Sequence, residues 1–248
     1  MSEPHHLRSA PITEAIIDFR VKARPSFHAQ EFSALKSTLV DRFPKVEERR
    51  GGKVTFQLSP GSTSYPAIED IGLQGYFFKS PDDKLVAQFR IDGFTLNRLK
   101  PYTSWKELHP VATELWQQYC KIASPEAITR VALRYINHIP LPSDLSDFGR
   151  YLRAAPSVPS ELPQYISAFF SRVTIHDPDK LLAAHVVQAL ETDAAARRIT
   201  LILDIDAFQE VDMPPRDPAL ETTLDQLRNF KNLIFFSYLT DETLRHFE

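Results

Sequence analysis

Two stretches of this chain, 116 residues apart, carry apolar and polar side chains in the same order. They are residues 15–19 (AIIDF) and residues 131–135 (VALRY). A second pair, residues 91–94 (IDGF) and residues 205–208 (IDAF), is separated by 114 residues. A nearly constant offset of this kind constrains the fold, because it indicates one supersecondary unit that is present twice.

The local signals around these stretches fall in the same order in both halves: strand, helix, three strands, helix. In the first half we expect a strand at 12–21, a helix at 32–43, strands at 54–58, 73–78 and 85–96, and a helix at 104–124. In the second half we expect a strand at 128–139, a helix at 144–152, strands at 165–175, 181–190 and 199–208, and a last helix from 217. Ser104 and Glu107 have the spacing of a capping box at the start of one helix. The pattern predicts an α+β protein of two βαβββα units, residues 1–124 and 125–248, that form one compact body. Their strands would build a mostly antiparallel, extended or curved sheet with helices on one face.

Composition narrows the classes of function. The formal net charge is −3, with 17 basic against 14 acidic residues in 1–124 (+3) and 12 against 18 in 125–248 (−6). A balance of this kind disfavours a purely electrostatic nucleic-acid binder, although the first half leaves nucleic acid open as a partner. The single cysteine, Cys120, and the lack of a long apolar run favour a cytoplasmic protein without disulfides or membrane spans.

Catalytic signatures are missing from the sequence. It contains no Walker loop, dinucleotide-binding fingerprint, HExxH, GxSxG or paired CxxC motif, and it has 7 glycines. We therefore expect no cofactor and no catalytic residues, and favour a non-catalytic protein over an enzyme.

Several stretches resemble a sporadically distributed prokaryotic protein family of about this length that has no assigned activity. They are residues 11–17 (PITEAII), 88–94 (QFRIDGF) with Asn97 and Arg98, 134–137 (RYIN), and 235–236 with 239–242 (FF and LTDE). The resemblance covers nearly the whole chain. It implies a bacterial accessory gene in a mobile-element or defence-related neighbourhood, and it implies no chemistry.

Basic and amide side chains fall on or at the ends of the predicted strands. These candidates for ligand or partner binding are Arg90, Asp92, Asn97, Arg98, Arg134 and Asn137. Guanidinium and amide groups could converge there on an acidic or phosphate-bearing ligand. Strict alternation along 85–96 predicts that Arg90, Asp92 and Phe94 share one face of a single strand. The simpler interpretation is a cross-strand ladder of ion pairs.

Three aspartates offer a metal site as an alternative. Asp204 and Asp206 are two residues apart on a predicted strand, and Asp92 takes the place of Asp206 in the first half under the offset of 114. Their carboxylates could hold Mg²⁺ for phosphodiester hydrolysis. They could equally pair with arginines such as Arg90, Arg130 or Arg134.

The C-terminal helix is apolar nearly all round near Phe235 and Phe236, which indicates core packing or a docking surface. Our leading hypothesis is a macromolecule-binding protein with a protein partner or a second copy of itself. The alternatives are a nucleic-acid binder that uses Arg90, Arg98, Lys100 and Arg134, the metal-dependent hydrolase, and small-molecule capture between sheet and helices.

Overall fold

All described strands belong to one antiparallel sheet. The computed structural model describes residues 7–55, 67–142, 147–193 and 198–248. The nine strands lie in the order β2-β3-β4-β5-β1-β6-β9-β8-β7. Their bounds are β1 Ile12–Lys22, β2 Lys45–Thr55, β3 Ala67–Lys79, β4 Leu85–Arg90, β5 Gly93–Leu99, β6 Ala127–Leu141, β7 Phe170–Asp177, β8 Leu182–Asp193 and β9 Arg198–Met213. The predicted α+β class is confirmed, and β1 and β6 join the two halves of the chain into a single sheet.

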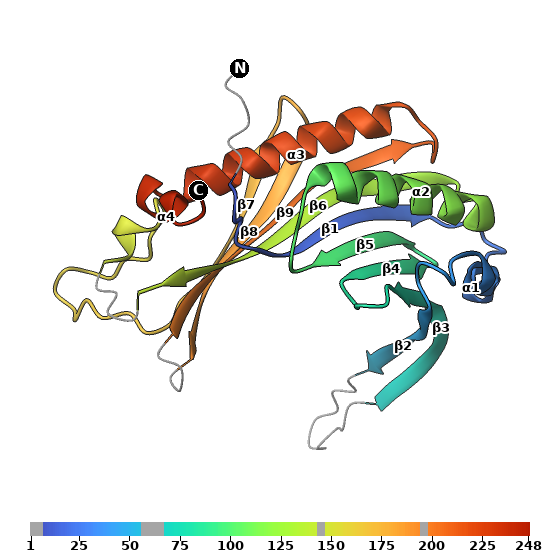
Figure 1. The fold of residues 1–248 in the computed structure, drawn as a ribbon, viewed down its shortest axis with the longest axis horizontal. Coiled ribbons are helices and arrows are strands. Elements are labelled where there is room, and N and C mark those ends of the chain that lie inside the picture. The colour runs from blue at the N-terminus through green and yellow to red at the C-terminus, as the bar shows by residue number, and fades with distance from the viewer. Residues whose placement is uncertain (1–6, 56–66, 143–146, 194–197) are drawn as a thin grey trace, which may run out of the picture.

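Two long helices cover one side of this sheet. They are α2 (Trp105–Ala123) and α3 (Ala219–Tyr238), and α3 packs against β6 and β9. The shorter elements are η1 (Ala29–Ala34), α1 (Leu35–Thr38), η2 (Phe148–Arg150) and α4 (Asp241–Arg245). In Figure 1 the sheet arches beneath α2 and α3, and its other side forms the underside of the arch.

The core lies between the sheet and these helices because alternate strand residues point toward them. On β1 these residues are Ala15, Ile17 and Phe19, at most 2% exposed. The Phe19 ring lies 4.7 Å from that of Trp116 on α2, and Phe94 stacks on Phe19 at 6.4 Å. The intervening residues of each strand therefore face the underside of the arch.

The predicted long strand over 85–96 is wrong, because the chain turns at Ile91 and Asp92 and forms the two strands β4 and β5. The first half consequently holds five strands, where we expected four. Because of the turn, the prediction that Arg90, Asp92 and Phe94 share one face is also wrong. Phe94 pairs with Phe89, and both rings lie in the core beneath α2. Alternation restarts at the turn, so Arg90 shares its face with Thr95 and not with Phe94.

Two helix predictions are also corrected. The stripe expected over 32–43 is buried, but the segment forms a 3-10 helix and a single α-helical turn. The helix expected over 144–152 is reduced to η2, and its first residues, 144–146, lie outside the described part of the chain. The predicted strand 54–58 continues beyond β2 into residues that are likewise not described.

The helix predicted over 104–124 is confirmed as α2. Its capping box is not formed as expected, since the Ser104 hydroxyl donates to the Glu107 carboxylate at 3.4 Å instead of accepting a backbone N–H. The helix ends at Ser124, whose φ of 42° is left-handed. Pro125 follows it and cannot continue a helix.

Candidate binding face

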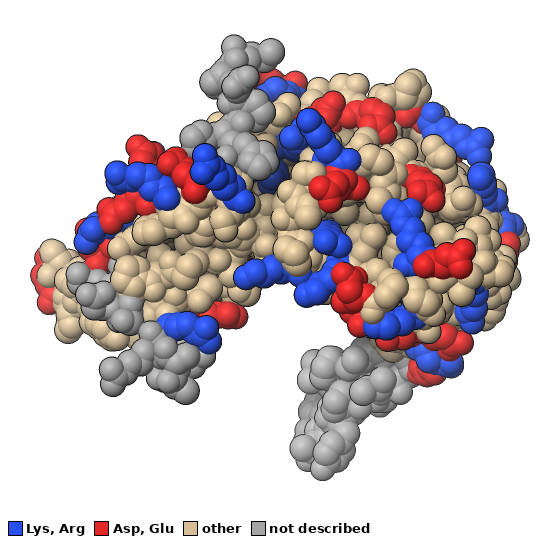
Figure 2. Space-filling model, in the orientation of Figure 1, with Lys and Arg blue, Asp and Glu red and all other residues tan. Residues whose placement is uncertain are grey.

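We call the underside of the arch, opposite α2 and α3, the open face. The strands β4, β5, β1, β6 and β9 lie side by side there, so their outward residues form adjacent rows. In Figure 2 the underside is hollowed, and side chains of both charge signs lie along it. The charged and polar residues that the pairing brings together are Arg90, Thr95, Asp18, Arg20, Arg130, Arg134, Asp204 and Asp206, and we call them the ion-pair ladder.

Asp18 is the centre of the ladder. Its Oδ1 accepts hydrogen bonds from Arg90 Nη2 at 3.1 Å and from Thr95 Oγ1 at 2.6 Å. Its Oδ2 accepts from Arg20 Nε at 3.2 Å and lies 3.6 Å from Arg130 Nη1. The side chains of Asp18 and Arg90 are only 12% and 8% exposed, so these charges are held in place by one another.

Arg130 on β6 connects the ladder to β9. Its Nη2 donates to Asp206 Oδ2 at 2.7 Å, and its guanidinium lies 4.4 Å from the centre of the Phe208 ring. The neighbouring Arg134 donates two hydrogen bonds to Asp204, at 2.9 Å and 2.6 Å. This pairing raises the pKa of the Arg134 guanidinium, so the residue is charged at every physiological pH.

An amide chain borders the ladder. Asn97 Nδ2 donates to Glu14 Oε1 at 2.6 Å, and Gln88 Nε2 donates to Asn97 Oδ1 at 3.0 Å. Polar side chains are thus connected from β4 to β9 by hydrogen bonds and, between Asp18 and Arg130, by an ion pair. The open face presents a surface whose polar groups are already oriented.

At one end of the open face lies a hollow of about 640 Å³. It is lined by Thr13, Lys100, His138, Pro140, Glu191, Thr192, Arg198 and Thr200. Two of these side chains, Lys100 and Arg198, are basic, and one, Glu191, is acidic. The hollow could hold an acidic group of a partner next to the ladder.

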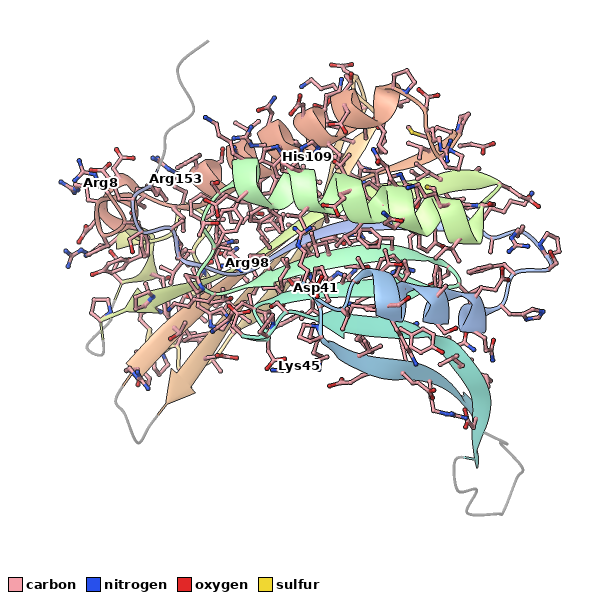
Figure 3. All side chains as sticks on the ribbon, turned by 45° about the vertical axis from the view of Figure 1, so that its right-hand side comes forward. Arg8, Asp41, Lys45, Arg98, His109 and Arg153 are labelled. Carbon is pink, nitrogen blue, oxygen red and sulfur yellow. The ribbon has the colours of Figure 1, made fainter. Side chains whose placement is uncertain are left out.

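The predicted site residues separate into two groups. Arg90, Asp92, Asn97 and Arg134 lie in or beside the ladder. Arg98 does not, because its Nε donates to the carbonyl oxygen of Pro101 near the end of β5, where Figure 3 labels it.

Three further predicted residues are buried or partly buried. Asn137 is 1% exposed, and its Nδ2 donates to the carbonyl oxygen of Leu203 at 2.9 Å. Phe235 is 8% exposed and packs edge to face with Phe236, which is partly buried against the same core. A large apolar residue that α3 exposes is Leu233, at 64%.

Each of the three aspartates of the metal hypothesis forms an ion pair with an arginine. Asp92 contacts Arg90 at 3.1 Å, while Asp204 and Asp206 bind Arg134 and Arg130. Within the described residues no group of three His, Cys, Asp or Glu side chains could hold a metal ion. The donor set therefore does not fit a divalent cation, and the simpler interpretation of a cross-strand ladder describes the geometry.

The supposed equivalence of Asp92 and Asp206 also fails. Asp18 pairs with Thr95 on β5, and Arg134 pairs with Asp206 on β9. Asp18 corresponds to Arg134 at the offset of 116. Their pairing partners therefore correspond as well, so the counterpart of Asp206 is Thr95 and not Asp92. Asp92 lies in the turn, outside the strand.

Sequence reasoning missed Asp18 and Thr95 as members of the site and treated Arg130 only as a possible ion-pair partner. A signal for Asp18 is present: apolar residues at 15, 17 and 19 place it on the opposite face of the strand. Nothing local to Thr95 distinguishes it, because its role depends on the register of two strands.

The fold and the open face together define an α+β protein built on a single nine-stranded, open antiparallel sheet, with a polar face on the side away from α2 and α3. No family model matches the chain, and no curated protein matches it in sequence. Of the helices in the described ranges, none has the length and apolar character needed to cross a bilayer.

Proposed function

We propose that this chain is a non-catalytic, macromolecule-binding protein that docks a protein partner, or a second copy of itself, on the open face. The observation that supports this most is the ion-pair ladder. It places oriented charges of both signs on the side of the sheet that α2 and α3 leave uncovered.

The charge balance of the ladder and the residues beside it favours protein over nucleic acid. The acidic residues there are Glu14, Asp18, Asp92, Asp204 and Asp206, and the arginines are Arg20, Arg90, Arg130 and Arg134. Five negative against four positive charges give −1. A phosphate backbone would meet repulsion along such a surface, whereas a protein with interspersed charges would be complementary to it.

Exposure assigns different roles to members of the ladder. The side chains of Arg20, Arg134 and Asp92 are 49%, 45% and 57% exposed, while those of Arg90 and Asp18 are nearly buried. The exposed members would contact the partner. The buried members would hold them in a fixed arrangement, which lowers the entropy lost on binding.

The architecture supports the proposed duplication of a βαβββα unit, with an additional strand in the first copy. The first half runs outward from β1 as β5-β4-β3-β2, and the second runs outward from β6 as β9-β8-β7. Ile17 pairs with Leu133, the residue 116 positions later, so a pseudo-twofold axis would pass through that pair. A cytoplasmic role in a bacterial defence or mobile-element system is part of this proposal and rests on the family resemblance alone.

A nucleic-acid partner is the second candidate, because the hollow carries Lys100 and Arg198. Its signature would be an affinity that falls steeply as salt rises, with several counterions released. A protein partner held by balanced charges would show a shallow dependence.

The direct test is photo-crosslinking in living cells, with a photoreactive amino acid at position 20 on the open face and, as a control, at position 233 on α3. Both side chains are exposed, and they lie on opposite sides of the sheet. We expect a discrete protein adduct from position 20 that is weaker or missing when Arg134→Glu is added. Equal adducts from both positions, or none from position 20, would refute the proposal.

A further inference from the structure

A second site lies on the other side of the sheet, between α2 and the start of α3. It is a cavity of about 460 Å³, a size typical of small-molecule sites. Figure 3 shows His109 on α2 near α3, and its Nε2 lies 2.9 Å from Glu221 Oε2, so this contact connects the two helices. The open face has no part in the cavity.

The inner wall of the cavity is apolar. Trp116, Cys120 and Leu220 line it and are at most 7% exposed. The Trp116 Nε1–H already donates to the carbonyl oxygen of Pro215 at 3.1 Å, so the indole offers a ligand its ring surface only. Burial raises the pKa of the Cys120 thiol to about 12, which keeps the thiol neutral. An aromatic or aliphatic body would fit against this wall.

The rim of the cavity is charged, and its acids are engaged. Asp217 Oδ1 accepts the backbone N–H of Ala219 at 2.8 Å, and Glu221 contacts His109. Lys121 and Arg216 also line the cavity, and neither makes a hydrogen bond or ion pair with a described residue. Two cations that have no partner among the described residues, beside an apolar wall, are complementary to an anionic amphipathic molecule.

We propose that this interhelical cavity binds a small amphipathic anion, with its apolar body against Trp116, Cys120 and Leu220 and its acidic group on Arg216 and Lys121. The site is independent of the proposed docking on the open face. The chemical class of the ligand is an organic carboxylate, sulfonate or phosphate with an aromatic or aliphatic body.

The test compares two fluorescent probes that share an aromatic body, 8-anilinonaphthalene-1-sulfonate and the neutral N-phenyl-1-naphthylamine. We expect saturable binding of the sulfonate to the full chain. The double variant Arg216→Gln and Lys121→Gln should weaken it about tenfold or more and change the neutral probe less than about twofold. The control is Arg172→Gln, an exposed arginine on β7, which should leave both affinities unchanged.

The location is tested by filling the cavity. Leu220→Trp should abolish binding of both probes. If circular dichroism shows that this variant does not fold, Gln117→Trp is used in its place, because Gln117 is an exposed residue of the cavity lining. Binding that survives a folded tryptophan variant would place the probe elsewhere and overturn the proposal. Lack of saturable binding, or equal loss in Arg172→Gln and the double variant, would overturn it as well.

Discussion

Arg90 Nη2 lies 3.1 Å from Asp18 Oδ1, although the two residues are 72 positions apart in the sequence. Their contact crosses β5, which lies between β4 and β1. The Thr95 hydroxyl on β5 lies between them and hydrogen-bonds to both. This triad fixes the central part of the open face and can be tested by substitution.

Asp18→Asn should lower the free energy of unfolding by about 3 kcal/mol, because it removes the nearly buried anionic partner of the Arg90 guanidinium and leaves only the exposed Asp92 carboxylate. Chemical denaturation measures the change. Asp92→Asn is the matched control, since it removes an exposed carboxylate from the same arginine and should cost less than about 1 kcal/mol. Equal losses in the two variants would contradict the central role of Asp18.

Gly93→Ala should destabilise the sheet by about 3 kcal/mol or more. Gly93 has a φ of 155°, and a Cβ at this position would overlap with the carbonyl oxygen of Phe19 on the adjacent strand. Thermal unfolding checks the loss. Gly149→Ala, where the added Cβ meets only the Asp147 side chain, should shift the melting temperature far less. An unchanged melting temperature in Gly93→Ala would show that the strands can separate at this point.

Lys231 should make stability depend on pH. Its side chain is buried, its Nζ lies 3.8 Å from the centre of the Tyr135 ring, and desolvation lowers its pKa from 10.5 to about 7. The unfolded chain therefore binds more protons than the folded chain between pH 7 and 10.5, so stability rises with pH across this window. The expected gain between pH 7 and 10 is about 3 kcal/mol.

Lys231→Met removes the ionisable group at similar length and supplies the comparison. Unfolding curves of both proteins at pH 7, 8.5 and 10 should show the variant more stable at pH 7, with the difference shrinking toward pH 10. Parallel pH profiles for the two proteins would show that Lys231 keeps its charge in the folded state.

The sequence predicts those parts of the fold that depend on local periodicity. The strand at 12–21 and the helix at 104–124 are found where their apolar spacing places them. The alternation of apolar residues over 85–96 predicts one strand, although Asp92-Gly93 is a pair typical of two-residue hairpin turns. The structure has a turn at Ile91 and Asp92, and β1 holds it, since Val21 N–H donates to the Asp92 carbonyl oxygen at 3.0 Å.

The candidate site is harder to predict because it depends on register. Arg90 and Arg134 stand out as charged residues on strands, but their partners Asp18 and Asp204 follow only from the order β4-β5-β1-β6-β9. Phe235 differs from these residues, because its prediction depended on how a helix packs and not on strand register. Its apolar surroundings indicated burial on more than one side or a partner surface, and its packing in the core required knowledge of how α3 lies on β6 and β9.

The central claim is that the open face binds a protein, and the most direct measurement is the affinity of the partner captured from position 20. Arg20→Glu combined with Arg134→Glu should weaken that affinity at least about tenfold, because both exposed guanidinium groups would face the partner with inverted charge. Lys106→Glu, an equal charge reversal at an exposed residue of α2 on the other side of the sheet, should leave the affinity unchanged. Undiminished affinity in the folded double variant would contradict the account.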